Sequence, residues 1–186
     1  MISLFPLQKV ITIIAIVYAL FLALIFSTTE NNINTSLVFK FSVLLETIVF
    51  ISFLWGWKYL WKLIPQLNNW VFPNLNGTWN VKINWTWNEK KGTTEGTMYI
   101  KQNFFTLSME LVTDESESET LLVQPKRNPE SGRLILYYTY LNTSINSDSH
   151  IGTAILKLKH LDNNKLSGNY FTDRDTKGKI ELEKEI

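Results

Sequence analysis

The segment Leu166–Asp175, with the sequence LSGNYFTDRD, places polar side chains at alternate positions on an otherwise apolar face. Side chains of a β-strand alternate between its two faces, so Tyr170, Thr172 and Arg174 share the interior-facing parity of the leucine that opens the segment. A guanidinium group forms paired hydrogen bonds with phosphate, and aromatic rings stack on nucleobases. This spacing favours a binding site for a ligand that carries both phosphates and flat bases.

A second group of aromatic side chains lies on the segment Gly77–Trp87, which alternates in the same way. Trp79, Trp85 and Trp87 share one face of this segment and would add broad aromatic surfaces to the interior. A structural interpretation stays open beside the binding one. Aromatic residues of small β domains often only fill the core, and Arg174 has an aspartate on each side, so it could form an ion pair within a turn.

The sequence contains no pattern that is typical of catalysis. It has no cysteine, two histidines without matching carboxylates, and no P-loop, nucleophile elbow or metal-ligand spacing. We therefore expect no enzyme, no catalytic residues, no metal and no cofactor. The net charge is +1 and the basic residues are dispersed, which argues against a DNA or RNA duplex as partner.

Residues 74–186 alternate between apolar and polar positions, and turn signals interrupt the alternation. The pattern predicts about eight short strands: 77–87, 97–102, 104–112, 120–124, 133–141, 150–160, 165–172 and 177–185. Between the first two strands it predicts a turn over 88–96, and between the third and fourth a turn over 113–119. Closing such a meander into a small antiparallel up-and-down β-barrel buries one face and removes the edge strands. A two-sheet sandwich is the alternative architecture.

The N-terminal part is strongly apolar. Residues 10–26 carry no charge, and with one further turn they would cover the roughly 30 Å hydrocarbon core of a bilayer. A second apolar segment, residues 36–60, ends among aromatic residues and lysines, as helices do at the headgroup boundary. We predict a transmembrane hairpin of two α-helices in residues 1–64, a juxtamembrane linker in 65–73 and the β-barrel in 74–186.

The basic residues predict how this hairpin is oriented. Lys9 precedes the first segment, Lys58 and Lys62 flank the end of the second, and the connection between the segments lacks Lys and Arg. The positive-inside rule then places both termini and the barrel in the cytoplasm. Glu46 lies near the middle of the second segment, where a carboxyl group is costly in lipid. It would either contact another helix or line a pore, or hydrogen-bond to Ser42 one turn earlier.

These features together resemble a known family. The hairpin, the opening strand LNGTW at 75–79 and the motif GNYFTDRDTKG at 168–178 are similar to the two-transmembrane β-barrel effectors of bacterial CBASS antiphage defence, which are STING-like sensors of cyclic oligonucleotides. The resemblance implies a bacterial inner-membrane protein whose barrel binds a cyclic dinucleotide made by a partner nucleotidyltransferase. Binding would then drive self-association and disruption of the lipid bilayer by the helices.

The resemblance also implies roles for individual residues. Tyr170, Thr172 and Arg174 would belong to the nucleotide pocket, and Trp79 with Tyr138 or Tyr140 would stack on the bases. Ser42 and Glu46 would mediate contacts between associated helices. Two other hypotheses stay open: a membrane-anchored, lipocalin-like barrel for a lipid or small hydrophobe, and a structural subunit whose solid barrel only docks a protein.

Overall fold

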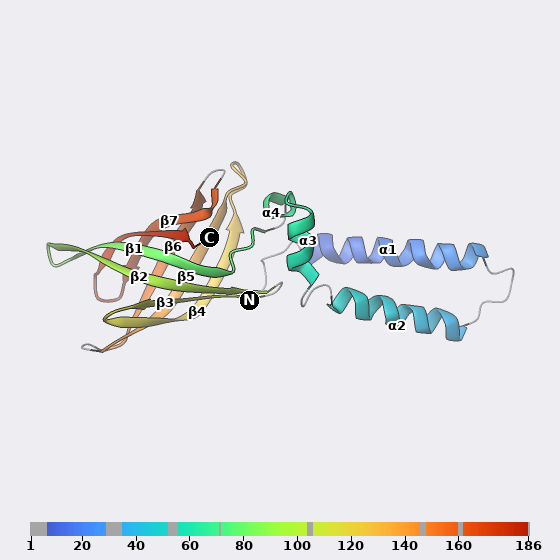
Figure 1. Cartoon of the computed structure of the whole chain (residues 1–186), viewed down its shortest axis with the longest axis horizontal. Helices are drawn as coiled ribbons and strands as arrows, with labels where there is room; N and C mark the ends of the chain where they lie inside the picture. Colours follow the sequence, from blue (N-terminus) through green and yellow to red (C-terminus); the bar gives the residue numbers. More distant parts are fainter. Residues whose placement is uncertain are drawn as a thin grey trace. The chain divides into compact units, whose positions relative to one another are not determined.

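The computed structural model describes residues 7–28, 35–51, 56–70, 72–103, 106–145, 148–159 and 162–185. The chain divides between residues 71 and 72 into a helical unit and a β-sheet unit, and each is described by itself (Figure 1). The helices of the first unit are α1 (Leu7–Thr28), α2 (Thr35–Ile51), α3 (Trp57–Leu63) and α4 (Leu67–Trp70). The predicted segment 36–60 thus contains α2 and the start of α3, and residues 52–55 lie outside the described ranges.

Helices α1 and α2 lie side by side (Figure 1). Tyr18 Oη is 2.7 Å from Ser42 Oγ, and the ring centroids of Phe21 and Phe41 are 5.7 Å apart. Ser42 Oγ also donates to the carbonyl oxygen of Val38, at 3.0 Å. Ser42 therefore contributes to the contact between the two helices within one chain.

The outer surface of this hairpin is apolar. Leu20, Leu24, Phe39 and Phe50 have between 62% and 70% of their surface exposed, and Glu46 is exposed among such residues on α2. None of the helices in the described part of the chain combines the length and the apolar character that crossing a bilayer requires. The transmembrane hairpin stays a prediction.

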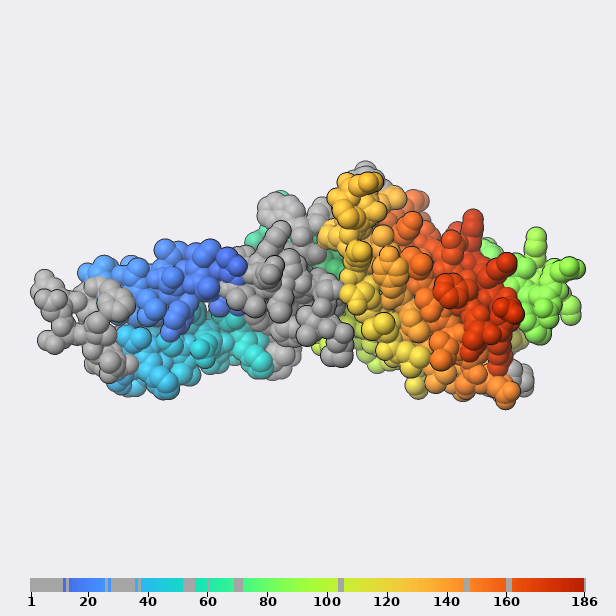
Figure 2. All heavy atoms as spheres, turned by 180° about the vertical axis from the view of Figure 1, so that it is seen from behind, coloured from blue at the N-terminus to red at the C-terminus, as the bar shows by residue number. Residues whose placement is uncertain are grey.

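The second unit is a closed antiparallel barrel in which each strand pairs with the next and β8 pairs with β1. The strands are β1 (Gly77–Trp87), β2 (Lys90–Gln102), β3 (Leu107–Thr113), β4 (Ser116–Arg127), β5 (Leu134–Ser144), β6 (His150–Lys159), β7 (Asp162–Thr172) and β8 (Lys177–Lys184). The predicted eight-strand barrel is confirmed. The sandwich alternative is wrong, because the β1–β8 pairing closes the sheet. Figure 2 shows the outer face that the later strands form, in orange and red.

The β1–β2 turn is shorter than the sequence predicts. The prediction covers residues 88–96, but β2 begins at Lys90, so Asn88 and Glu89 make the turn. Their φ angles are 45° and 68°. Positive φ at both central residues is the geometry of a type I′ hairpin turn, whose twist matches that of the flanking strands.

The β3–β4 turn is also shorter than predicted. Residues 113–119 are expected as one acidic turn, but β4 begins at Ser116. The hydroxyl oxygen of Thr113 accepts hydrogen bonds from the backbone nitrogens of Ser116, at 3.0 Å, and Glu115, at 3.4 Å. This side-chain bonding folds the chain back within two residues, and so it returns Ser118 to the barrel interior.

One end of the barrel, here called the closed end, is filled with apolar side chains. The chain enters the barrel here, and the β2–β3, β4–β5 and β6–β7 connections lie at this end. Trp79, Met98 and Leu136 are fully buried, and Phe72 and Leu75 from the entering segment are 2% and 0% exposed. Although the linker prediction extends to residue 73, the structure packs the chain from residue 72 onward with the barrel.

Candidate functional site

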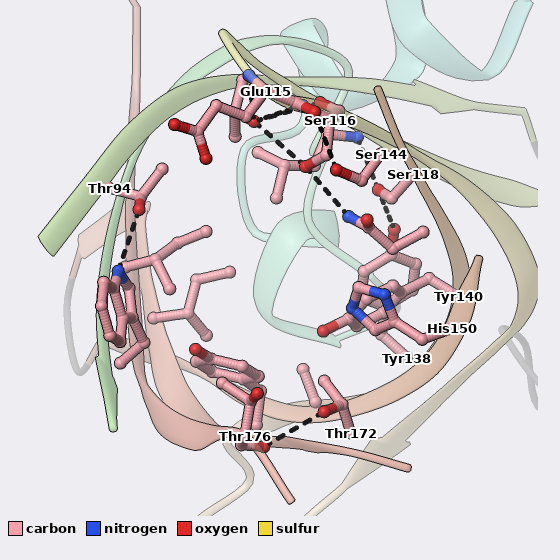
Figure 3. Close-up of a pocket in the computed structure, with 18 residues that line it drawn as sticks. Thr94, Glu115, Ser116, Ser118, Tyr138, Tyr140, Ser144, His150, Thr172 and Thr176 are labelled. Carbon is pink, nitrogen blue, oxygen red and sulfur yellow. Dashed lines mark hydrogen bonds between the residues drawn. The ribbon is translucent and has the colours of Figure 1, made fainter. Parts of the chain in front are cut away.

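The opposite end of the barrel, here called the open end, is hollow (Figure 3). A cavity of about 270 Å³ lies where the β1–β2, β3–β4, β5–β6 and β7–β8 turns come together. Every strand contributes at least one lining side chain, from Ile83 on β1 to Ile180 on β8. A hollow interior at this end contradicts the hypothesis of a solid barrel that only docks a protein.

Aromatic rings form part of the cavity wall. Tyr138 and Tyr140, which follow each other on the inner face of β5, are stacked with ring centroids 5.0 Å apart. Tyr170 lines the cavity from β7, and Trp85 lines it from β1. The Trp85 indole nitrogen donates to Thr94 Oγ1 at 3.1 Å, which fixes the ring (Figure 3). These rings offer the flat surfaces on which a nucleobase stacks.

Glycines on neighbouring strands make room for two of these rings. Gly152 is the register partner of Tyr140, and a side-chain carbon at Gly152 would lie 2.2 Å from Tyr140 Cζ. Gly92 is the partner of Trp85, and a carbon there would lie 2.3 Å from Trp85 Cζ2. Carbon atoms need about 3.5 Å. The rings can therefore lie against the wall, and the centre of the open end stays empty.

Hydroxyl groups close the seam between β3 and β4. The two strands pair in register at Leu111–Ser118 and at Val112–Glu117. Elsewhere Thr120 Oγ1 accepts from the Met109 nitrogen at 2.8 Å and donates to the Met109 oxygen at 2.7 Å.

Two cavity-lining hydroxyls take part in the same seam. Tyr138 Oη donates to the Met109 oxygen at 2.7 Å, and Ser118 Oγ accepts from the Leu111 nitrogen at 3.1 Å. Both side chains line the cavity. Two of the hydroxyls that line the cavity therefore also hold β3 in place.

Two buried polar atoms beside the cavity have no hydrogen-bond partner in the described part of the chain. They are Asn142 Oδ1 and His150 Nδ1. Both residues line the cavity, and they are opposite each other in the β5–β6 register. Buried polar groups are nearly always paired. Two neighbouring exceptions beside a cavity leave both atoms available to a hydrogen-bonding partner in the cavity.

The histidine and the tyrosines in the cavity wall favour their uncharged forms. Burial lowers the pKa of His150, and the nearby positive charge of Arg174 lowers it further. Burial raises the pKa of Tyr138 and of Tyr170 to about 12. At neutral pH the imidazole is therefore neutral, and these phenols keep their protons as hydrogen-bond donors.

Thr172 and Arg174 lie at the rim of the open end. Thr172 is 9% exposed and lines the cavity from the end of β7. Arg174 lies in the following turn, outside the lining, where its backbone nitrogen donates to Thr172 Oγ1 at 3.3 Å and its guanidinium donates to the Asp148 carbonyl oxygen. Of the predicted pocket residues, the structure thus brings together Tyr138, Tyr140, Tyr170 and Thr172, with Arg174 beside them.

The structure does not bring Trp79 to this site. The Trp79 ring is fully buried at the closed end, and its indole nitrogen donates to the Leu75 oxygen at 2.9 Å. The ring therefore does not line this cavity, and the geometry gives its predicted stacking role no support. Ser42 and Glu46 belong to the helical unit and form no part of the cavity.

The polar residues that continue the inner face of β5 were not among the residues predicted from the sequence. The segment 137–144, YYTYLNTS, places Tyr138, Tyr140, Asn142 and Ser144 at alternate positions. All four side chains line the cavity. A run of inward aromatic and then polar residues toward one strand end is the signal that could have identified Asn142.

The lining contains one histidine and one glutamate, and its other side chains are neutral. Among the described residues, no group of three or more His, Cys, Asp or Glu side chains could hold a metal ion. The site instead combines aromatic faces, hydroxyl groups and two unpaired polar atoms. Such a surface is suited to binding a flat, hydrogen-bonding ligand.

Comparison with known proteins agrees with this arrangement. A relative from Staphylococcus schleiferi, "CD-NTase-associated protein 15", is 27% identical over 169 residues, which cover 88% of this chain and 87% of the relative. The family model described as "Cap15, cyclic dinucleotide receptor domain" matches residues 70–184. This match spans all eight strands and the cavity, and more than half of the 186 residues. The chain therefore belongs to the Cap15 cyclic dinucleotide receptor family.

Proposed function

We propose that this chain is a non-enzymatic effector of CBASS antiphage defence that binds a cyclic dinucleotide in the cavity at the open end. A partner nucleotidyltransferase would make this messenger. The observation that carries the proposal is the coincidence of the receptor-domain match with a barrel that contains a hollow, aromatic and hydrogen-bonding end. The two proteins need not touch, because the messenger diffuses between them.

The cavity has room for part of such a ligand. Its volume of about 270 Å³ lies below the roughly 300–1,000 Å³ of pockets that enclose a drug-sized molecule. A cyclic dinucleotide is at least as large as a drug-sized molecule, so this cavity cannot enclose it completely. One base would enter and stack on the tyrosine rings, for about 1–3 kcal/mol. The phosphodiester ring would stay at the rim, within reach of Arg174.

The same geometry disfavours the alternative of a lipocalin-like barrel for a lipid or small hydrophobe. Hydrocarbon in the cavity would leave Asn142 Oδ1 and His150 Nδ1 without partners. An unsatisfied buried polar group costs roughly 1–3 kcal/mol. A base edge satisfies such groups, whereas an acyl chain cannot.

The second part of the proposal concerns the helices. Ligand binding would drive self-association of the chain, and the helical hairpin would then disrupt the bacterial inner membrane, with both termini in the cytoplasm. Support comes from the apolar outer surface of α1 and α2, since extended exposed apolar surface indicates contact with lipid or with other proteins. Tethering to one another raises the effective concentration of the helices and favours their association.

Ligand binding tests the first part. Purified full chain is titrated with cyclic dinucleotides, and melting temperature and heat of binding are recorded. Ligand at a hundred times Kd should add about 2.7 kcal/mol to the stability of the barrel. Arg174→Ala should weaken binding by roughly 10-fold or more, the effect of losing a charge-assisted hydrogen bond. Arg133→Ala, at an exposed position near the closed end, is the matched control.

Release of dye from vesicles tests the second part. Full chain is mixed with vesicles of phosphatidylethanolamine and phosphatidylglycerol, and the ligand is added afterwards. Ligand-dependent release, with an increase in oligomer size by light scattering, is the expected result. Binding without any release would remove the membrane role and leave the receptor role intact.

A further inference from the structure

Asn142 is placed where a ligand in the cavity must meet it. It lies on the inner face of β5, opposite Ser118 on β4 and His150 on β6. Its side chain lines the cavity, yet the residue is only 9% exposed. The Oδ1 atom is buried without a partner in the described part of the chain, although a buried acceptor is costly to leave unpaired.

Hydrogen bonds orient the Asn142 amide. Its Nδ2 atom donates to Ser116 Oγ at 3.2 Å. Ser116 is itself held by Thr113, whose Oγ1 accepts from the Ser116 nitrogen at 3.0 Å and donates to the Ser116 oxygen at 3.1 Å. Because the amide nitrogen is engaged on this side, the oxygen is left as the unpaired acceptor of the amide.

A second unpaired atom belongs to the cross-strand neighbour of Asn142. His150 is the direct cross-strand neighbour of Asn142, and its Nδ1 atom is also buried without a partner in the described residues. Directly opposite residues of an antiparallel pair have Cβ atoms about 4.5–5.5 Å apart. The two side chains can therefore contact neighbouring atoms on one edge of the same molecule.

The chemistry of these atoms selects the part of the ligand that they meet. A carbonyl oxygen accepts hydrogen bonds and is repelled by the oxygens of a phosphodiester, so Asn142 Oδ1 does not bind the phosphates. Amide side chains do pair with the edges of bases. Tyr140 lies two residues earlier on the same inner face and provides the stacking surface beside this edge.

We propose that Asn142, together with His150, reads the hydrogen-bonding edge of the one base that enters the cavity, and that Asn142 Oδ1 accepts an N–H group of that base. This inference rests on the proposed function and makes it more specific. In this inference, Asn142 on β5 and His150 on β6 determine which base is preferred, and Arg174 at the rim binds the phosphates. The second base of the messenger remains outside the cavity.

The test uses the purified full chain and four probes: the cyclic dinucleotides that carry two adenines, two guanines, two cytosines or two uracils. Their affinities are measured for the wild type, Asn142→Ala, Ser116→Ala and Asn169→Ala. Asn169→Ala is the matched control, because Asn169 is exposed on β7 and does not line the cavity. Circular dichroism and melting confirm that each variant is folded.

We expect the wild type to prefer some of the four probes. Asn142→Ala should reduce the affinity for the preferred probe by about 10-fold or more, as for the loss of a base contact, and should bring the four affinities together. Ser116→Ala keeps Asn142 Oδ1 as an acceptor but removes the hydroxyl that orients the Asn142 amide. It should therefore reduce the differences in affinity among the four probes less than Asn142→Ala does. Asn169→Ala should behave as the wild type.

Other results overturn the inference. An equal loss for all four probes in Asn142→Ala would indicate contact with the ribose or a structural role, and an unchanged preference would exclude base reading by this residue. A wild type that binds all four equally has no base preference for Asn142 to provide. A folded wild type that binds neither these four probes nor the mixed-base cyclic dinucleotides, titrated in the same way, contradicts the proposed function itself, which is a different result from the preceding ones.

Discussion

The hydroxyl-closed seam between β3 and β4 makes a sharp prediction about two side chains that bond to the same residue. Thr120 Oγ1 is the acceptor for the Met109 nitrogen, at 2.8 Å, and a donor to the Met109 oxygen, at 2.7 Å. Tyr138 Oη is a second donor to that oxygen, also at 2.7 Å. Removal of the Thr120 hydroxyl therefore leaves the Met109 nitrogen without its acceptor, whereas removal of the Tyr138 hydroxyl leaves the Met109 oxygen with one of its two donors.

Thr120→Val removes the hydroxyl oxygen that accepts from the Met109 nitrogen, so this buried N–H group loses that hydrogen-bond acceptor. Such a loss costs roughly 1–3 kcal/mol. Tyr138→Phe removes one of two donors to the Met109 oxygen, which keeps its bond from Thr120. That change should cost only about 0.5–1.5 kcal/mol. We expect Thr120→Val to open the seam more, although Tyr138 is the larger and more deeply buried residue.

Hydrogen–deuterium exchange of the full chain, read on peptides that cover Leu107–Thr113, measures this opening. Thr120→Val should speed exchange of the Met109 amide by roughly 5- to 150-fold, the equivalent of 1–3 kcal/mol. Thr139→Val is the control. The hydroxyl oxygens of Thr139 and Thr153 are 3.3 Å apart, but the strands β5 and β6 are also paired in register at these residues, so the loss of this hydroxyl should not open them. Equal or larger exchange in Tyr138→Phe would refute the reasoning, and so would unchanged protection in Thr120→Val.

Three further predictions follow from the cavity and the helices. Gly152→Ala should weaken cyclic dinucleotide binding in calorimetry, because the new carbon, 2.2 Å from Tyr140 Cζ, pushes that ring into the cavity; unchanged affinity would show that the wall has room. His150 has a lowered pKa, so the unfolded chain binds the proton more readily. The melting temperature should then fall as pH drops from 7 through about 6.5, and less steeply in His150→Gln; equal slopes would contradict this. Glu46→Gln should leave ligand binding intact and change cell killing on expression with the messenger-producing enzyme, and unaltered killing would leave this carboxyl without a role.

The barrel itself could be predicted because its period-two pattern continues through nearly every strand. In β1, Val81 is buried and Lys82 is exposed, and in β8, Ile180 and Leu182 are buried between exposed residues. Such alternation requires a sheet with one buried face. Antiparallel neighbours along the sequence then leave a barrel as the simplest way to remove both edges.

The depth of each side chain in the barrel could not be predicted in the same way. Trp79 and Trp85 share one face of one strand, yet Trp79 fills the closed end and Trp85 lines the cavity. Six residues of strand span about 20 Å, so equal parity does not mean a shared site. Depth depends on register, which the turns set. The start of β2 predicted from the sequence, residue 97, is seven residues later than the observed start at residue 90. The pairing of Gly92 with Trp85 therefore could not be predicted.

The division between a closed and an open end resolves a conflict between stability and binding. A dry cavity of 270 Å³ created in an apolar core would cost roughly 6 kcal/mol, at about 24 cal/mol per Å³. Here the wall carries hydroxyls and the unpaired atoms of Asn142 and His150, so water can occupy the space before a ligand arrives. A ligand that displaces this water must form hydrogen bonds with Asn142 and His150, and it must have a flat face that stacks on the tyrosine rings. A nucleobase has both and hydrocarbon has neither, so we expect this lining to favour a base over an acyl chain.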